Sequence, residues 1–139
     1  MKLGELARDY LRRGEVRVRS AEMAQASGDY PDVVRFSQEA VELSLKAALR
    51  SRGVEYPKEH DVGKILLDVA GAFPAWFNER ARELMEISSD LASKRAAAMY
   101  GLEQGSRSPE EIFGDADAVE SLASARKVFD AVTKLLAEP

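Results

Sequence analysis

Arg95 and Tyr100 flank a run of small apolar residues in the stretch KRAAAMYG, near the end of a long segment with helical periodicity. An arginine can hold a phosphate through paired N–H donors, and a phenol can donate a hydrogen bond. His60, the single histidine of the chain, opens a His-Asp pair, and imidazole can move protons near neutral pH. Arg95, Tyr100 and His60 are therefore the candidate ligand-binding residues.

Residue content excludes several kinds of catalytic site. The chain has no cysteine, so it lacks thiolate nucleophiles, thiolate metal sites and disulfides. A lone histidine makes a poor zinc site. Carboxylate pairs such as Glu39 with Glu42 have no Glu-x-x-His element beside them, which dicarboxylate metal sites normally carry. There is also no Gly-rich phosphate loop and no serine in a nucleophile elbow. We therefore expect no metal and no cofactor.

The composition predicts one globular domain over residues 1–139, since the chain is 45% hydrophobic and 32% charged. A net charge of -4 disfavours general nucleic-acid binding, yet residues 1–20 carry six basic residues against three acidic ones. These basic residues either form a local face for phosphate or are the solvated side of an amphipathic helix. No segment has the apolar length of a signal peptide or a membrane span, so we predict a cytoplasmic protein without membrane contact.

Hydrophobic periodicity predicts an all-α fold. It indicates four long helices and one short helix, over residues 3–27, 31–52, 61–71, 74–100 and 115–137. The second helix is apolar over so wide an arc that we expect it to be buried on two sides. Residues 101–114 are predicted to be a surface loop in which Ser108 and Glu111 form a capping box for a single turn. Short connections favour an antiparallel up-and-down bundle.

Arg95 lies in line with the apolar residues of the helix that begins at Pro74. A buried charge without a partner is costly, so we expect an internal carboxylate, an anionic ligand or a second subunit beside it. The internal carboxylates that could serve are Glu39, Glu42 and Asp90. Tyr100 with Gly101 could be only a helix C-terminus, and His60 could cap or brace the start of the short helix.

Residues 29–67 carry a combination of motifs. An aromatic-led turn precedes the second helix, and the run Ser37–Glu42 is followed by Leu45–Ala47. Gly53 then ends the helix, and the pair His60–Asp61 opens the short one. This arrangement resembles the HEPN family of helical-bundle domains. The resemblance extends over nearly the whole chain, because the later helices continue the family order.

The resemblance implies an up-and-down bundle that forms homodimers. It also implies frequent pairing with a separately encoded minimal nucleotidyltransferase, often as a toxin and antitoxin couple. Many members of the family are metal-independent ribonucleases with an arginine, four to six intervening residues and a histidine, duplicated across the dimer. In that chemistry the arginine holds the scissile phosphate and the histidine moves the proton of the ribose 2′-hydroxyl.

The ribonuclease motif is incomplete in this chain. Seven residues separate Arg52 from His60, outside the family spacing, and Arg95 is followed after four residues by Tyr100 in place of histidine. A free phenol has a pKa of about 10 and is a poor general base at neutral pH. Losing a general acid or base removes about 100- to 10,000-fold in rate.

We therefore predict a homodimeric HEPN binding or regulatory protein, associated with nucleotide or RNA and without competent nuclease activity. One alternative is a divergent metal-independent ribonuclease that uses Arg95 and Tyr100. The other alternative is a structural scaffold without a ligand.

Overall fold

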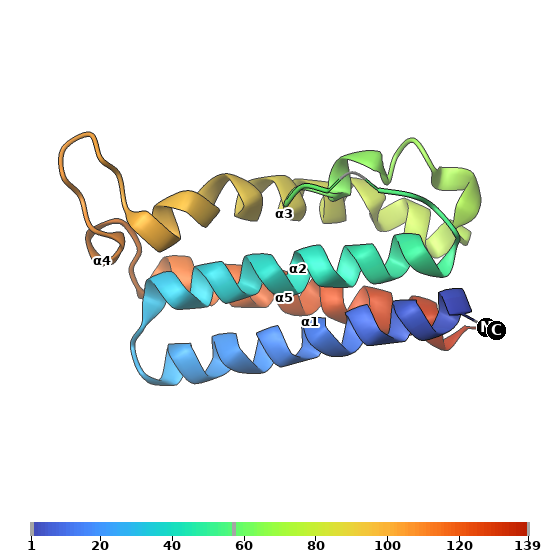
Figure 1. The fold of residues 1–139 in the computed structure, drawn as a ribbon, viewed down its shortest axis with the longest axis horizontal. Helices are drawn as coiled ribbons and strands as arrows, with labels where there is room; N and C mark the ends of the chain where they lie inside the picture. Colours follow the sequence, from blue (N-terminus) through green and yellow to red (C-terminus); the bar gives the residue numbers. More distant parts are fainter. Residues whose placement is uncertain (1, 57, 139) are drawn as a thin grey trace.

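Four long helices form an antiparallel bundle in the computed structural model, which describes residues 2–56 and 58–138 (Figure 1). The long helices are α1 (Lys2–Ala26), α2 (Tyr30–Ser51), α3 (Ala75–Tyr100) and α5 (Asp115–Ala137), and successive ones run in opposite directions. The all-α bundle is thus confirmed. Within the described ranges, no helix combines the length and apolar character needed to cross a membrane.

Helix α2 lies at the centre of the bundle. It packs against α1, α3 and α5, and its buried residues cover more than one face, from Val33 and Val34 near its start to Ala47, Ala48 and Leu49 near its end. The prediction of burial on two sides is confirmed. Because its remaining face is narrow, polar side chains on α2 lie close to the neighbouring helices.

The long loop after α3 forms as predicted. Ser108 accepts a hydrogen bond from the Glu111 backbone N–H at 3.3 Å, and the Glu111 carboxylate accepts one from the Ser108 N–H at 3.1 Å. This capping box begins the single turn α4 (Pro109–Ile112). In Figure 1 the loop before α4 extends beyond the end of the bundle. Gly101 ends α3 with a φ of 76°, as expected of a helix C-terminus.

The predicted short α-helix over residues 61–71 is wrong. The structure has two 3-10 helices there, η1 (Gly63–Ile65) and η2 (Ala70–Ala72). Tertiary contacts explain the difference, because this segment is fixed to α3 at its start. A Cβ on Gly63 would lie 2.6 Å from the Cβ of Ser88, and the Gly63 N–H donates to Ser88 Oγ at 3.2 Å. Close docking on α3 therefore replaces regular helix formation.

We predict that Gly63→Ala destabilises the fold, because the new methyl group would collide with Ser88 and force the segment away from α3. Overpacking of this kind costs about 1–3 kcal/mol, so thermal denaturation should show a Tm several degrees below wild type. Gly71→Ala is the matched control, since a Cβ at Gly71 would meet nothing within 4 Å. Equal Tm values for the two variants would contradict this account.

Candidate functional site

Three polar residues of α2 form the base of the site. Gln38 is 1% exposed, and the side chains of Glu39 and Glu42 are 16% and 15% exposed. Residues three or four apart share one side of a helix, so Gln38 and Glu42 face the same neighbours. Buried carboxylates need partners, and the partners come from α1, α3 and the segment after α2.

Glu39 gathers three guanidinium groups. Its carboxylate lies 2.8 Å from Arg17 Nε, 2.9 Å from Arg95 Nη1 and 3.4 Å from Arg35 Nη1. Arg17 belongs to α1, Arg35 to α2 and Arg95 to α3. Arg35 is shared with Asp32, whose Oδ1 lies 3.9 Å from Arg35 Nη2. Three arginines therefore meet two carboxylates here, and the small positive excess favours anions.

Arg95 has the internal partner that its position required. Glu39 is the carboxylate among the three candidates, and the Arg95 side chain is 21% exposed. Its Nη1 also donates to Gln38 Oε1 at 2.7 Å. The other guanidinium nitrogens make no hydrogen bond to the described residues, so donors remain for a bound anion.

The buried side chain of Gln38 connects Arg95, Glu42 and the backbone of His60. While its Oε1 accepts from Arg95, its Nε2 donates to Glu42 Oε1 at 3.1 Å and to the His60 backbone carbonyl at 3.4 Å. A buried amide is costly unless both ends are satisfied. Here both ends are used, and the buried amide fixes Arg95 relative to the segment that carries His60.

His60 contacts α2 instead of capping η1. Its Nδ1 lies 2.7 Å from Glu42 Oε1, and its side chain is 56% exposed. A carboxylate can only accept, so the Nδ1 carries the hydrogen and the Nε2 is left with its lone pair. Of the two expected roles, capping is wrong, since η1 begins after Val62 without a side-chain cap. Bracing is confirmed, because His60 ties the segment before η1 to Glu42 of α2.

Glu42 is held in its ionised form. Burial by itself would raise its pKa, but hydrogen bonds from Lys46, Gln38 and His60 outweigh burial and lower the pKa below the ordinary value of 4.5. The Lys46 Nζ lies 2.9 Å from Glu42 Oε2. A charged Glu42 keeps the His60 ring oriented.

Asp61 also braces the segment that carries His60. Its two carboxylate oxygens accept from Ser88 Oγ and Ser89 Oγ, each at 2.7 Å. Both serines lie on α3, and Ser88 also accepts from the Gly63 N–H. This pair of bonds fixes the segment between α2 and α3, and so it sets the position of His60.

Tyr100 lies at the last position of α3 and is 77% exposed. It does not pack beside the helix end.

The three predicted ligand-binding residues, Arg95, Tyr100 and His60, line two adjoining hollows. The hollows share His60 and Arg95, and together we call them the Arg95 cleft. The first, of about 210 Å³, is lined by Arg17, Glu39, Glu42, Leu43, His60 and Arg95. The second, of about 360 Å³, is lined by His60, Ala92, Arg95, Ala96, Met99 and Tyr100.

The free donors of the cleft can bind an anion. Over residues 2–56 and 58–138, no three histidine or carboxylate side chains gather where they could hold a metal ion. Glu39 and Glu42 are instead engaged by arginine, lysine and histidine. The free donors of Arg95, the imidazole of His60 and the phenol of Tyr100 suit a phosphate-bearing ligand.

Comparison with known proteins gives the same result as the motifs. The model of the HEPN domain family matches residues 7–135. The chain belongs to the HEPN family. The crystal structure of an archaeal HEPN homologue is similar, with a TM-score of 0.71, 20% sequence identity, and coverage of 94% of this chain and 97% of that one. The comparison with curated proteins gave no match.

Sequence reasoning found the three outer residues of this HEPN cleft but missed its interior. Gln38 and Arg17 were not identified as site residues. Gln38 did carry a signal, because it occupies a core position between Val34 and Val41 at helical spacing, where a polar residue needs partners. Arg17 carried none, since it is one of several arginines with similar spacing on α1.

We predict that Glu42 makes the stability depend on pH below about pH 5. Its pKa is lowered in the folded protein, so the unfolded chain takes up this proton at higher pH. Stability is therefore complete above the ordinary carboxyl pKa and falls as the pH drops through the folded value. Urea denaturation between pH 5.5 and 3 should show a smaller loss in Glu42→Gln than in wild type.

Glu86→Gln is the control for this measurement. Glu86 is exposed on α3 and pairs with none of the described residues. Its variant should keep the wild-type pH dependence. The same loss of stability in wild type and Glu42→Gln would contradict the role assigned to Glu42.

Proposed function

We propose that this HEPN protein is a homodimeric binding or regulatory module whose Arg95 cleft takes a phosphate group of a nucleotide or RNA. The observation that carries the proposal is the arrangement of Arg95. Its guanidinium is fixed by Glu39 and Gln38 through one nitrogen, which leaves further donors for an anion. A pre-positioned arginine loses little freedom when it binds phosphate, and this favours affinity.

The positive excess around Glu39 supports an anionic ligand. Arg17, Arg35 and Arg95 surround this one carboxylate, although the whole chain carries a net charge of -4. A local concentration of positive charge attracts phosphate even on an acidic protein. The ligand would therefore bind at the cleft and not over the general surface.

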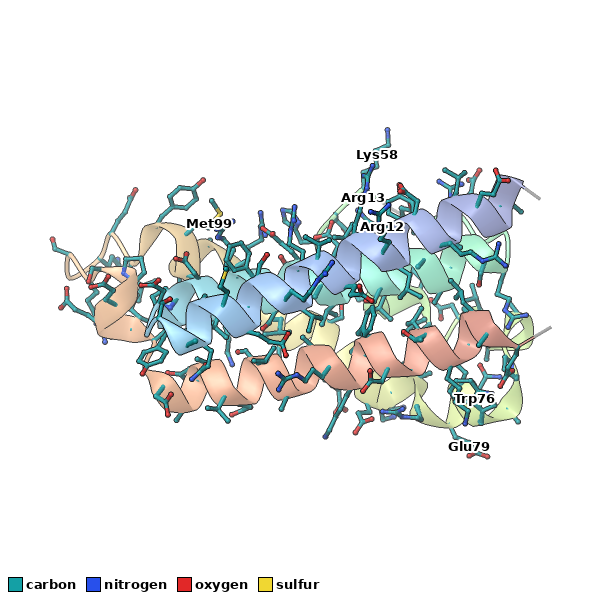
Figure 2. All side chains as sticks on the ribbon, turned by 90° about the horizontal axis from the view of Figure 1, so that it is seen from below. Arg12, Arg13, Lys58, Trp76, Glu79 and Met99 are labelled. Carbon is teal, nitrogen blue, oxygen red and sulfur yellow. The ribbon has the colours of Figure 1, made fainter. Side chains whose placement is uncertain are left out.

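The end of α3 supports the homodimer. Met99, Tyr100 and Leu102 are 39%, 77% and 44% exposed. Met99 and Tyr100 line the cleft, and Figure 2 shows Met99 at the end of α3. Exposed large apolar side chains in one place favour a contact with another protein. A second copy there would bring two Arg95 clefts together.

Partnership with a minimal nucleotidyltransferase in a toxin-antitoxin-like module belongs to the same proposal and rests on family membership. The simplest observation that bears on it is the identity of the neighbouring gene. Co-purification of that gene's product with this chain would be the direct measurement. The cytoplasm remains the compartment that we predict for such a module.

We predict that Arg95→Gln weakens binding of a fluorescein-labelled single-stranded RNA by at least about tenfold, because charge-assisted hydrogen bonds contribute about 1.5–3 kcal/mol. Fluorescence anisotropy at several salt concentrations should also show a salt slope smaller by about one. Sedimentation velocity on the same samples reports the dimer.

Arg82→Gln is the matched control, since Arg82 is an exposed arginine on the same helix. Its RNA affinity and dimerisation should stay close to wild type. If Arg95→Gln changes neither RNA binding nor dimer stability, the proposed role of Arg95 is lost. If wild type binds no nucleotide or RNA at all, the chain is better described as a structural scaffold.

A divergent metal-independent ribonuclease is the second candidate. The sequence suggested Arg95 with Tyr100 as its pair, and the structure adds His60, which lines the same cleft and is oriented by Glu42. His60 Nε2 would take the proton of the 2′-hydroxyl while the 2′-oxygen attacks the phosphorus, and the bond from phosphorus to the 5′-oxygen would break as that oxygen takes a proton from solvent water. The products would be a 2′,3′-cyclic phosphate and a 5′-hydroxyl.

A cleavage assay with labelled single-stranded RNA and excess chelator separates the two candidates. The binding module should leave the RNA intact, while the ribonuclease would cleave it in wild type and not in Arg95→Gln. In that second case His60→Gln and Tyr100→Phe identify the base, since the variant lacking it should lose about 100- to 10,000-fold in rate. Cleavage of this kind would replace the binding-module proposal.

A further inference from the structure

Another hollow lies further along α2, separate from the two hollows of the Arg95 cleft. It has a volume of about 390 Å³ and is lined by Tyr10, Lys46, Arg50, Glu55, Tyr56 and Lys58. Its residues come from α1, from the second half of α2 and from the segment that follows α2. We call it the Tyr56 pocket. No sequence motif indicates this pocket, because its lining residues belong to three separate parts of the chain.

The pocket contains more positive than negative charge. Lys46, Arg50 and Lys58 line it together with the single carboxylate of Glu55. The Lys46 Nζ is paired with Glu42 at 2.9 Å, but Arg50 and Lys58 form no ion pair with any of the described residues. In the view of Figure 2, Lys58 projects away from the bundle.

Arg50 is held in place without having its hydrogen-bonding capacity filled. Its Cζ lies 5.4 Å from the Tyr56 ring centroid, and the Lys46 Nζ lies 5.5 Å from the same centroid. These cation–π contacts fix the two side chains beside the ring. The Arg50 Nε is buried, and it has no hydrogen-bond partner among the described residues. A buried donor of this kind is costly until an acceptor binds.

The pKa values of Tyr10 and Tyr56 are shifted in this pocket. Hydrogen bonding with Tyr56 lowers the pKa of Tyr10, and the charges of Arg50 and Lys46 act in the same direction against the effect of burial. Burial is the main cause that raises the pKa of Tyr56. The opposite pKa directions of the two phenols come mainly from their shared hydrogen bond and from burial, and the charges of Arg50 and Lys46 add a smaller effect that favours negative charge on oxygen.

We propose that the Tyr56 pocket binds a phosphate group through Arg50, with Lys46 and Lys58 supplying charge and the hydroxyls of Tyr10 and Tyr56 supplying hydrogen bonds. Phosphate matches this set because guanidinium offers paired donors to its oxygens. Lys46 and Arg50 already contact the Tyr56 ring, so the ring is not free to stack on a base. The pocket therefore recognises the charged phosphate group.

The phosphate could belong to a small molecule or to an RNA strand that also occupies the Arg95 cleft. Glu42 contacts His60 in the cleft and Lys46 in the pocket, so the two sites adjoin along α2. Glu39 and Lys46 are seven residues apart, which places them about 10 Å apart along the helix axis. The pocket itself needs no ligand in the cleft.

The test uses the full chain with two probes. Inorganic phosphate is followed by 31P NMR line broadening in wild type and in Arg95→Gln, and the binding that Arg95→Gln keeps reports the pocket without the cleft. A fluorescein-labelled 12-nucleotide oligoadenylate reports a strand. Arg50→Gln should reduce phosphate binding at least about tenfold, and Lys58→Gln should reduce it less, because Lys58 is exposed. Lys58→Gln also keeps the test valid if Arg50→Gln fails to fold.

Arg52→Gln is the control, since it removes the same charge from an exposed residue that lines a different hollow. Its phosphate binding should equal that of wild type, and Arg95→Gln should keep phosphate binding at the Tyr56 pocket. If Arg50→Gln and Lys58→Gln bind phosphate as well as Arg52→Gln does, the proposal is overturned.

The oligonucleotide distinguishes the two sources of the phosphate. A loss of oligoadenylate binding in both Arg50→Gln and Arg95→Gln would identify one strand that spans pocket and cleft. A loss of phosphate binding in Arg50→Gln with unchanged oligoadenylate binding would identify a small phosphorylated ligand. Phosphate binding that depends on Arg50 in a protein that binds no RNA would support the pocket and refute the proposed function of the cleft.

Discussion

The carboxylate of Glu39 is the point at which three helices are joined by charge. It binds arginines from α1, α2 and α3, and it is itself mostly buried. Removing such a group from water is costly unless charged partners replace the water. Because the partners lie on different helices, the ionic cluster forms only when the bundle is assembled. The same cluster leaves positive charge at the mouth of the cleft.

Buried polar residues also fix the segment that follows α2. Gln38 reaches both Arg95 and the backbone of His60, while Asp61 is bound by two serines of α3. The segment after α2 has little regular structure of its own, so these contacts determine where His60 lies. A loop placed by a rigid helical scaffold is a common way to position functional groups.

One polar stripe of α2 serves both candidate sites. Its residues recur at three- and four-residue spacing and are Arg35, Glu39, Glu42, Lys46 and Arg50. Glu39 and Glu42 line the Arg95 cleft, and Lys46 and Arg50 line the Tyr56 pocket. The central helix therefore packs into the core on more than one side and lines two neighbouring hollows with its polar stripe. In our proposal this stripe gives an acidic chain local sites for phosphate.

The sequence by itself determined the four long helices and their order, because 3.6-residue periodicity, glycine stops and a capping box are local signals. Its combination of motifs indicated the family. It also showed that Arg95 needs a partner. Only the tertiary structure decided that the partner is Glu39, that residues 61–71 form two 3-10 helices, and that His60 lies beside Arg95. These outcomes depend on contacts such as Gly63 with Ser88, between residues far apart in the chain. Such contacts exist only once the helices have packed.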